Sequence, residues 1–484
     1  MRATLSDSIR IPRVEIPDTV RLAIEQQLTI PNPAKDLAQR ELLWGADRMD
    51  DHMRLYGYDD DGCMVLPMGF KHALLQGLNY YGIQLEVVDE RKYNSSPHRP
   101  HPTRNTTPIE LRGYQEPMCQ ALIDGECGVV EAPTAAGKTA VSLEAIRRVD
   151  QYALVIVEKA SLAQQWAKAC QDLLGIDPGY LGEGETRWGG ITIALRQAMW
   201  ARRQELWDQG FFYWWGAVLI DECHHAATAA SLIGLIQRFN ARYRWGVTAT
   251  PDRDPAYFPV LQAVVGPVLW ETTMQDAADH LVIPRVRVLE STFEFDFHPT
   301  SWAMIDGRRR KIRNNYNDMM AAICTDRHRN AIIAAAAAME ARAGHHILIV
   351  SQRKEQLYHI RDLIGDGELL IHTLVGGEAS RMLDIKRTIE TADCGSILLS
   401  TIADEGLSID RLDRVIPAYP RRNPETMRQI AGRIMRPWPG KQDAVLIDIR
   451  DSHQELLRSQ FKDRAQLLYG REGWVIERAS ALAS

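Results

Sequence analysis

Short runs of apolar residues, each bounded by polar residues or glycine, recur through the middle of the chain. They lie at residues 128–131, 153–157, 191–195, 217–220 and 245–248. Stretches with helical spacing, such as 139–149 and 161–174, lie between several of them. The pattern restarts at residues 347–350, 396–400, 414–418 and 444–449. Apolar strands that alternate with helices are typical of a parallel sheet covered on both faces, so we expect an α/β fold with two tandem parallel-sheet lobes.

A polar, proline-rich stretch, NSSPHRPHPTRNTTP at residues 94–108, precedes these lobes. Its prolines exclude a helix and it has few side chains to bury, so it predicts a linker that separates an N-terminal module from the rest. We therefore expect a small α+β accessory domain at 1–93, a linker at 94–108, a first lobe at 109–283 and a second lobe at 284–484.

Composition limits how the protein can bind nucleic acid. The chain has 484 residues and a formal net charge of -6. Non-specific affinity for nucleic acid comes from neutralising phosphates, so this charge argues against a protein that coats DNA, and any contact must be local. The densest basic run is RRRKIR at residues 308–313. Its plainer interpretation is a solvated loop or the start of a helix.

Cysteine spacing and apolar run length bear on the compartment. The seven cysteines are odd in number and no two lie two to four residues apart, which favours reduced, mostly buried thiols over a disulfide framework or a zinc ribbon. No apolar run approaches the roughly 18 residues that span a bilayer. The N-terminus lacks the apolar segment of a secretory signal. We expect a protein of a cytoplasm, that of the host if the protein is phage-encoded.

The octapeptide APTAAGKT at residues 132–139 follows an apolar strand and opens a helix, the context in which a phosphate-binding loop is credible. Lys138 would reach the β and γ oxygens of ATP, and Thr139 would hold Mg²⁺. A bare G-K-[S/T] triplet arises by chance in roughly one chain in four of this length. The loop would hold the phosphates through the backbone of Pro133, Thr134, Ala135, Ala136 and Gly137.

The sequence DECH at residues 221–224 ends the apolar run 217–220, which places two carboxylates where ligands of parallel sheets bind. Asp221 would anchor Mg²⁺ through water, and Glu222 would polarise the attacking water as a general base. Cys223, His224 and His225 suggest a metal site as an alternative. Adjacent residues on a strand point to opposite faces, which argues against that alternative.

APTAAGKT, DECH, TATP at 248–251 and QIAGRIMR at 429–436 together resemble motifs I, II, III and VI of the superfamily 2 helicases, in the same order. The resemblance covers about residues 109–451. It implies two RecA-like lobes and ATP with Mg²⁺ as cofactors. It also implies that Arg433 and Arg436 of the second lobe reach the γ-phosphate, as an arginine finger does. The implied catalytic residues are Lys138, Asp221, Glu222, Gln429, Arg433 and Arg436.

Further stretches resemble other helicase motifs. LRGYQ at 111–115 resembles the motif whose glutamine recognises adenine, which adds Arg112 and Gln115 to the ATP site. SLAQQW at 161–166 and residues 194–198 resemble strand-contact motifs, and STIADEGLSI at 400–409 resembles motif V, which couples nucleotide to nucleic acid. Motif V adds Glu405 and Gly406 as nucleotide contacts. The candidate nucleic-acid contacts, two of them from the basic run, are Gln165, Gln197, Thr248, Thr250, Arg309, Arg310 and Thr401.

Two residues depart from the family pattern. Ala135 stands where the phosphate loop often has glycine, and Ser408 stands where motif V often has aspartate. Because alanine disfavours the left-handed region, we expect a negative φ at Ala135. The aromatic cluster formed by Trp207 and residues 211–215 could stack bases, but it directly precedes an apolar strand. That position favours packing at the end of the sheet.

The form of these motifs is most similar to the branch of XPB and UvsW, shared with type III restriction motors. Scattered residues between 30 and 91 also resemble the accessory domain of UvsW-like phage helicases. These similarities imply an ATP-driven DNA helicase or translocase that acts on forked or branched DNA in repair, recombination or replication. A duplex translocase that does not separate strands, an RNA helicase and an ATP-gated nucleic-acid clamp share the same motifs and remain alternatives.

Overall fold

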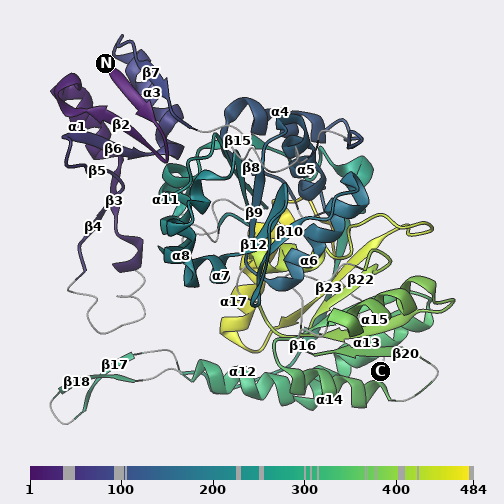
Figure 1. Cartoon of the computed structure of the whole chain (residues 1–484). Helices are drawn as coiled ribbons and strands as arrows, with labels where there is room; N and C mark the ends of the chain where they lie inside the picture. The colour runs from purple at the N-terminus through teal and green to yellow at the C-terminus, as the bar shows by residue number, and fades with distance from the viewer. Residues whose placement is uncertain are drawn as a thin grey trace. The chain divides into compact units, whose positions relative to one another are not determined.

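The chain forms two compact units, Met1–Asp276 and Ala277–Ser484, in the computed structural model (Figure 1). The predicted boundary between the lobes, at 283/284, lies close to the junction of these units. The structure describes all residues except 36–48, 92–102, 104–105, 134, 225–229, 250–255, 299–300, 306–307, 313–314, 366, 368, 376–378, 402–408, 422–423 and 479–484.

The first unit contains the first predicted α/β lobe. Its sheet has the strand order β11-β10-β12-β9-β13-β14-β8-β15, and all neighbours are parallel except β10 and β11. The five predicted strands are present with bounds shifted by at most two residues. The strands are β8 (Cys127–Glu131), β9 (Ala153–Val157), β10 (Gly179–Gly182), β11 (Glu185–Arg187), β12 (Ile191–Leu195), β13 (Ala217–Asp221), β14 (Tyr243–Thr248) and β15 (Val268–Glu271).

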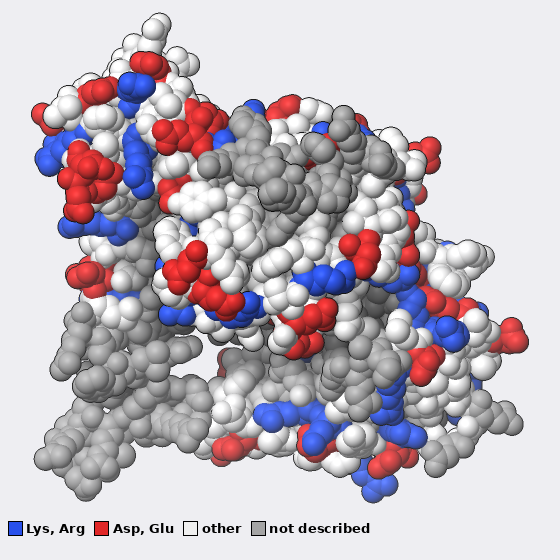
Figure 2. All heavy atoms as spheres, in the orientation of Figure 1, with Lys and Arg blue, Asp and Glu red and all other residues white. Residues whose placement is uncertain are grey.

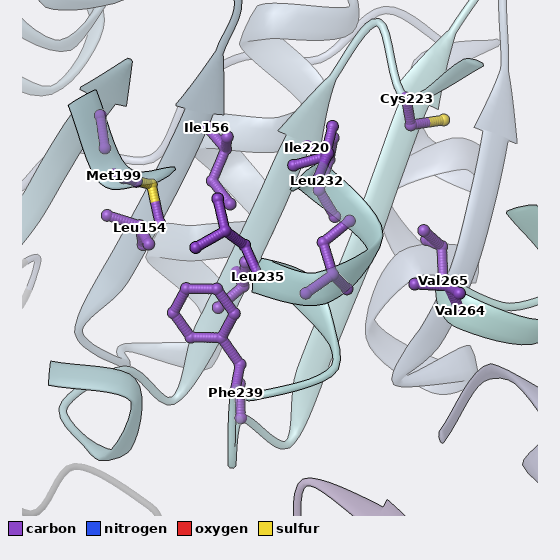
Figure 3. Close-up of a cluster of buried hydrophobic side chains, with 14 of the residues drawn as sticks. Leu154, Ile156, Met199, Ile220, Cys223, Leu232, Leu235, Phe239, Val264 and Val265 are labelled. Carbon is purple, nitrogen blue, oxygen red and sulfur yellow. The ribbon is translucent and has the colours of Figure 1, made fainter. Parts of the chain in front are cut away.

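Helices cover both faces of this sheet because alternate strand residues belong to two different cores. Val130, Val155 and Leu219 pack with α4 (Gln115–Gly125), α5 (Lys138–Val149) and α6 (Ala160–Ala169). Leu154, Ile156 and Ile220 pack on the other face (Figure 3). The helices there are α7 (Arg196–Ala201), α8 (Arg203–Asp208), α10 (Ala230–Ile236) and α11 (Phe258–Val264). The aromatic cluster lies in this second core, where Phe211, Phe212 and Trp215 are buried, which confirms packing over base stacking for those three rings.

The N-terminal domain is α+β, as predicted. Its sheet has the order β5-β6-β2-β1-β7, and helices α1 (Asp18–Gln27) and α3 (Lys71–Tyr80) pack with it in one apolar core. A two-stranded ribbon pairs β3 (Thr29–Pro31) with β4 (His52–Arg54). The sheet strands are β1 (Arg2–Leu5), β2 (Ser8–Pro12), β5 (Gly57–Tyr58), β6 (Cys63–Pro67) and β7 (Glu86–Asp89).

The N-terminal domain packs directly on the first lobe, in contrast to the separate module that the linker suggested. A Cβ on Gly69 would lie only 2.5 Å from the carbonyl oxygen of Gln262, so the two backbones are in close contact. The carboxylate of Glu126, next to β8, pairs with Lys71 at 2.6 Å and with Arg91 at 3.0 Å. Thr103, within the predicted linker, is itself buried. Long-range contacts thus tie the two parts together in spite of the proline-rich stretch.

The second unit contains the second predicted lobe, an all-parallel sheet of order β20-β21-β19-β22-β23-β16-β24. Its strands are β16 (Pro284–Ser291), β19 (His346–Val350), β20 (Leu370–Leu374), β21 (Ser396–Ser400), β22 (Arg414–Pro417), β23 (Ala444–Asp451) and β24 (Ile476–Arg478). Its helices are α12 (Tyr316–Thr325), α13 (Arg327–Arg342), α14 (Lys354–Ile364), α15 (Ala379–Thr391), α16 (Pro424–Ala431) and α17 (Glu455–Arg464).

The described part of the basic run, residues 308–312, is neither a loop nor the start of a helix. It forms β18 (Arg308–Ile312), which pairs antiparallel with β17 (Ser301–Ile305) in a two-stranded hairpin. All seven cysteines are free thiols and five are buried, as predicted. Among the described residues, the helices are too short or too polar to cross a membrane.

Candidate ATP and metal site

The predicted ATP-site segments of the first unit meet at one edge of the sheet. Strands β13, β14 and β8 are adjacent and parallel, so their carboxyl ends lie side by side. The register pairs Thr248 with Glu131, immediately before the phosphate loop, and Asp221 with Val247. Residues 132–139, 221–224 and 248, which are distant in sequence, therefore surround one site.

The phosphate loop contains two residues with left-handed backbone. Gly137, just before α5, has φ 82°, and Ala135 has φ 71°. The prediction of a negative φ at Ala135 is therefore wrong. Closing a tight loop between β8 and α5 requires the left-handed conformation at this position, although a Cβ there costs about 1 to 2 kcal/mol. Thr134 lies outside the described residues.

Gln115, the predicted adenine reader, is engaged with the phosphate loop. Its Nε2 donates to the carbonyl oxygen of Ala136 at 2.9 Å, and its Oε1 accepts from the backbone N–H of Arg112 at 2.9 Å. The side chain is only 4% exposed. A Cβ on Gly137 would lie 2.2 Å from this amide, so any other residue there would displace the side chain of Gln115. In this state Gln115 holds the loop, and its contact with adenine remains a prediction.

Lys138 and Thr139 occupy the first turn of α5, as the loop motif predicts. The ammonium of Lys138 donates to the carbonyl oxygens of Ala132 at 3.0 Å and of Pro133 at 3.4 Å. These bonds hold the cation over the loop that would carry phosphate oxygens. The start of a helix adds backbone N–H groups and a favourable dipole, which together suit a polyphosphate.

Asp221 is a half-buried carboxylate, and each of its oxygens accepts one hydrogen bond from the described residues. Oδ1 accepts from the backbone N–H of Glu222 at 3.0 Å, and Oδ2 accepts from the indole Nε1–H of Trp166 at 2.8 Å. Burial, with a further contribution from the charge of Glu222, raises the pKa of Asp221 to about 6. Two carboxylates in low dielectric favour a bound cation, so this donor set fits Mg²⁺ beside the phosphate loop.

Glu222, Thr248 and His224 form a chain of polar contacts. The hydroxyl of Thr248 donates to Oε2 of Glu222 at 3.3 Å, and Nδ1 of His224 lies 2.8 Å from the same hydroxyl. Strand β13 ends at Asp221, and Glu222 has φ 46°. The expectation that the DECH residues alternate along a strand is therefore wrong, because the chain turns after Asp221. The turn aims Glu222 at Thr248, and Cys223 is buried against Gly246 instead.

Within the part of the chain that the structure describes, the three-residue cluster with metal-ligand geometry is His345, Asp413 and Asp443, in the second unit. The guanidinium of Arg414 lies among these side chains, with Nη1 2.9 Å from Asp443 and Nη2 2.9 Å from His345. An arginine already neutralises that cluster. The alternative of a Cys223 and His224 metal site gains no third ligand from the described residues.

Two family models match the chain in succession. The model described as "Type III restriction enzyme, res subunit" matches residues 108–253, and the model described as "Helicase conserved C-terminal domain" matches residues 329–437. These ranges contain motifs I to III, V and VI. The chain belongs to the superfamily 2 helicases. Within them it is similar to XPB proteins and to a phage helicase.

Individual relatives agree with this family. The DNA 3'-5' translocase XPB2 of Sulfurisphaera tokodaii is 32% identical over 170 residues, 35% of this chain and 37% of that protein. The probable helicase D10 of Escherichia phage T5 is 24% identical over 376 residues, 77% of each chain. The DNA-bound restriction-modification enzyme LlaBIII has a TM-score of 0.51 at 15% identity, covering 78% of this chain and 31% of that one, which shows the fold. The matches span only about a third of the XPB proteins.

The two stretches that resemble strand-contact motifs, 161–166 and 194–198, lie at the start of helices at the same sheet edge. Helix α6 follows β9 and carries Gln165, whose buried Nε2 has no hydrogen-bond partner among the described residues. Helix α7 follows β12 and carries the exposed Gln197. Thr248 is buried in its contact with Glu222, beside the candidate ATP site, and its contact with nucleic acid remains a prediction. Thr250 lies outside the described residues.

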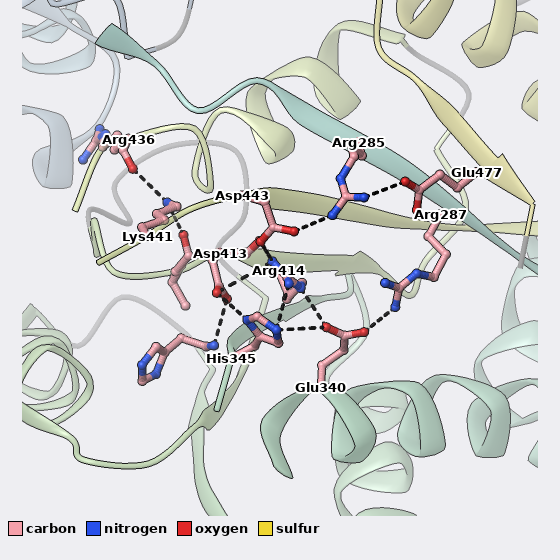
Figure 4. A network of polar contacts seen from close by, with 12 residues as sticks. Arg285, Arg287, Glu340, His345, Asp413, Arg414, Arg436, Lys441, Asp443 and Glu477 are labelled. Atoms are coloured by element: carbon pink, nitrogen blue, oxygen red, sulfur yellow. Dashed lines mark hydrogen bonds and ion pairs between the residues drawn. The ribbon is translucent and has the colours of Figure 1, made fainter. Parts of the chain in front are cut away.

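Helicase motif VI lies on and after α16 in the second unit. Gln429 and Arg433 are buried, whereas Arg436 is half-buried and pairs with Asp410 at 2.9 Å. Lys441 donates to the carbonyl oxygens of Arg436 at 2.8 Å and Leu412 at 2.6 Å (Figure 4). Thr401 directly follows β21, and Arg309 and Arg310 lie on β18. Glu405 and Gly406 lie outside the described residues.

Three residues at these helicase motifs were missed by sequence reasoning: Trp166, Asp410 and Lys441. Trp166 ends the stretch SLAQQW, which we assigned to strand contact rather than to the metal site. Asp410 lies two residues beyond Ser408, so its charge sits near the position where motif V often has aspartate. Lys441 follows motif VI and no sequence signal marks it.

Proposed function

We propose that this protein is an ATP-dependent DNA helicase or translocase that remodels forked or branched DNA in repair, recombination or replication. The observation that supports this proposal best is the meeting of the phosphate loop, Asp221 and Glu222 at adjacent strand ends, beside a helix of the strand-contact motif. Such a site would couple nucleotide chemistry to nucleic acid bound on that helix. The DNA translocase and phage helicase names of the relatives support DNA as the substrate.

In the proposed reaction, backbone N–H groups of residues 133–139 bind the phosphates and Lys138 approaches the β and γ oxygens. Thr139 and Asp221 would hold Mg²⁺, which neutralises the phosphate charge when it is bound. Glu222 would accept the proton of the attacking water, and Thr248 keeps its carboxylate oriented through the 3.3 Å contact. Each of these groups has an atom at the same sheet edge.

The second lobe would complete the site. We infer from the family resemblance that Arg433 and Arg436 stabilise charge on the γ-phosphate when the lobes close. Nucleic acid that binds both lobes would favour the closed state and so stimulate hydrolysis, which is a population shift toward the competent state. This step converts binding of DNA into ATP turnover.

Contacts with DNA would be local. Acidic and basic side chains are interspersed over the described part of the face in Figure 2, in line with the net charge of -6. In our proposal Gln165 and Gln197 contact the strand from α6 and α7, and the hairpin β17–β18 adds phosphate contacts through Arg309 and Arg310. Each phosphate neutralised by a cation makes binding more sensitive to salt, so hairpin variants should lower the salt dependence.

The N-terminal domain would recognise the junction. Residues 1–93 contain 15 acidic and 11 basic residues, which does not favour gripping by charge. Tyr80, at the end of α3, is 86% exposed and packs edge-to-face with Tyr81. Exposed aromatic rings stack on unpaired bases in single-stranded segments. We infer that this domain contacts a fork through base stacking more than through phosphates.

A duplex translocase that does not separate strands is the second candidate, because the XPB2 relative is described as a translocase. One experiment distinguishes the two. Forked DNA with a labelled strand measures unwinding, and a triplex on duplex DNA measures translocation by displacement of the third strand. We expect ATP-dependent release of the labelled strand from forked DNA. Displacement of the triplex without unwinding supports the second candidate, and no activity beyond that of Lys138→Ala on either substrate contradicts both.

A further inference from the structure

Among the described residues, Trp166 is the one whose side chain donates a hydrogen bond to the carboxylate of Asp221. The indole Nε1–H lies 2.8 Å from Oδ2, and the ring is 2% exposed. The other oxygen, Oδ1, accepts only from the backbone N–H of Glu222 within the described part of the chain. The orientation of this carboxylate therefore depends on one indole and one backbone group.

The position of that indole is set by helix α6. Ala163 and Trp166 form the buried face of the helix, against the core that contains Val155 and Leu219. Gln165, the neighbouring residue, carries the buried Nε2 that lacks a partner among the described residues. Gln165 and Trp166 are adjacent on one helix, so a ligand that engages Gln165 would act on the helix that carries Trp166.

We propose that Trp166 is a positioning residue that orients Asp221 toward its metal ion and relays nucleic-acid binding on α6 to that carboxylate. The inference deepens the proposed function and rests on it. Partners that hydrogen-bond a metal-ligating carboxylate orient it, and their loss typically lowers metal affinity or activity about 10- to 100-fold. A helix that binds nucleic acid and also supplies such a partner links the two sites directly.

The plainer interpretation is that Trp166 only fills the core. Trp245 provides a matched control because it is fully buried in the same core and its indole N–H also makes one hydrogen bond, to the carbonyl oxygen of Leu122 at 2.7 Å. Trp166→Phe and Trp245→Phe remove the same atoms and the same type of hydrogen bond. If Trp166 only fills the core, the two substitutions should have similar effects. If it positions Asp221, only Trp166→Phe should weaken the contribution of Mg²⁺ to nucleotide binding.

The test measures the affinity of full-length protein for a fluorescent ATP analogue, with Mg²⁺ and with the cation chelated. We expect Trp166→Phe to reduce the gain in affinity that Mg²⁺ provides by about 10-fold or more, with the metal-free affinity unchanged. Trp245→Phe should keep the wild-type gain. A wild-type gain in Trp166→Phe, or an equal loss in both variants, would overturn the inference. Trp166→Leu repeats the test if the phenylalanine variant does not fold.

A second arm tests the relay. Binding is reciprocal, so single-stranded DNA that raises the affinity for Mg·nucleotide must be bound more tightly in turn. Trp166→Phe should bind DNA alone with wild-type affinity but lose most of this coupling, and coupling of wild-type size contradicts the relay. Failure of the proposed function would look different from failure of this inference. In that case the wild-type protein itself would gain no nucleotide affinity from Mg²⁺, or would show no coupling to DNA.

Discussion

Arg436 and Asp410 form an ion pair, with Nη1 of the arginine 2.9 Å from Oδ1 of the aspartate. The backbone carbonyl of Arg436 also accepts from Lys441. The arginine that we place at the γ-phosphate is therefore held at its side chain and at its backbone within the second unit. To reach a phosphate, its guanidinium must exchange one anion for another.

This exchange predicts opposite effects for the two partners. Asp410→Asn removes the competing charge, so ATP turnover without nucleic acid should rise several-fold. Arg436→Ala should bind ATP and DNA but lose most of the nucleic-acid-stimulated turnover. Steady-state hydrolysis measures both, with Glu290→Gln as a control, because Glu290 pairs with Arg450 in a more exposed ion pair of the same unit. Stimulated turnover at the wild-type level in Arg436→Ala would remove this residue from the catalytic role.

The charge of Lys441 should make stability depend on pH. Burial, opposed by Asp413 and Asp410 and aided by Arg436 and Arg414, lowers its pKa to about 8. Unfolded lysine titrates near pH 10.4, so between about pH 8 and 10.4 the unfolded chain binds more protons and stability rises with pH. Below pH 8 Lys441 is charged in the folded protein, and the full cost of removing its ammonium from water lowers the stability.

Relative to Lys441→Met, the wild-type free energy of unfolding should therefore increase by about 1 to 3 kcal/mol between pH 7 and 10. Chemical denaturation at several pH values measures the difference between the two proteins, in which titration of other groups largely cancels. A difference that does not change with pH would show that Lys441 keeps an ordinary pKa.

The left-handed backbone of Ala135 predicts that glycine is tolerated there. Ala135→Gly should relieve about 1 kcal/mol of strain, offset in part by the greater freedom of glycine in the unfolded chain, and so be neutral or stabilise by up to about 1 kcal/mol. Ala136→Gly, next to it, should destabilise by about 1 kcal/mol because Ala136 is buried without a positive φ. Thermal unfolding measures the stability of both variants. Equal destabilisation by the two substitutions would contradict backbone strain at Ala135.

The packed N-terminal domain predicts that truncation has a structural cost. A protein that begins at about Arg104 would expose Cys127 and Ala263 of the shared core and leave Glu126 without Lys71 and Arg91. We expect it to melt at a clearly lower temperature than the full chain. Junction recognition is therefore better tested with Tyr80→Ala in the full chain, which should lower the preference for forked over single-stranded DNA. An unchanged preference would argue against base stacking by this domain.

Local patterns were sufficient to predict most of the motor fold. Strands such as Ala153–Val157 and Ile191–Leu195 are continuous apolar runs, and their bounds were predicted without error. Lys138, Asp221 and Glu222 could be found because Lys138 opens the helix that follows β8 and the two carboxylates stand at the end of β13. Parallel strands bring their carboxyl ends to one edge, so the grouping of these residues required no knowledge of distant contacts.

The features that were missed depend on contacts between distant segments. Trp166 and Asp221 are 55 positions apart, and their contact arises only when α6 packs on the sheet. The φ of Ala135 is set by closure of the loop, which overrides the preference of an isolated alanine. The linker was predicted from composition, which does not reveal that Glu126 and Gly69 join the N-terminal domain to the first lobe.

The central claim is that Glu222 drives ATP hydrolysis that DNA stimulates. The most direct measurement is steady-state ATP turnover of wild-type protein and Glu222→Gln with single-stranded, duplex, forked and four-way DNA and with RNA. We predict that DNA stimulates the wild type, most strongly when forked or four-way, and that Glu222→Gln binds ATP normally but hydrolyses it about 10² to 10⁴ times more slowly. Turnover that no nucleic acid changes, or Glu222→Gln activity near that of the wild type, would contradict the account.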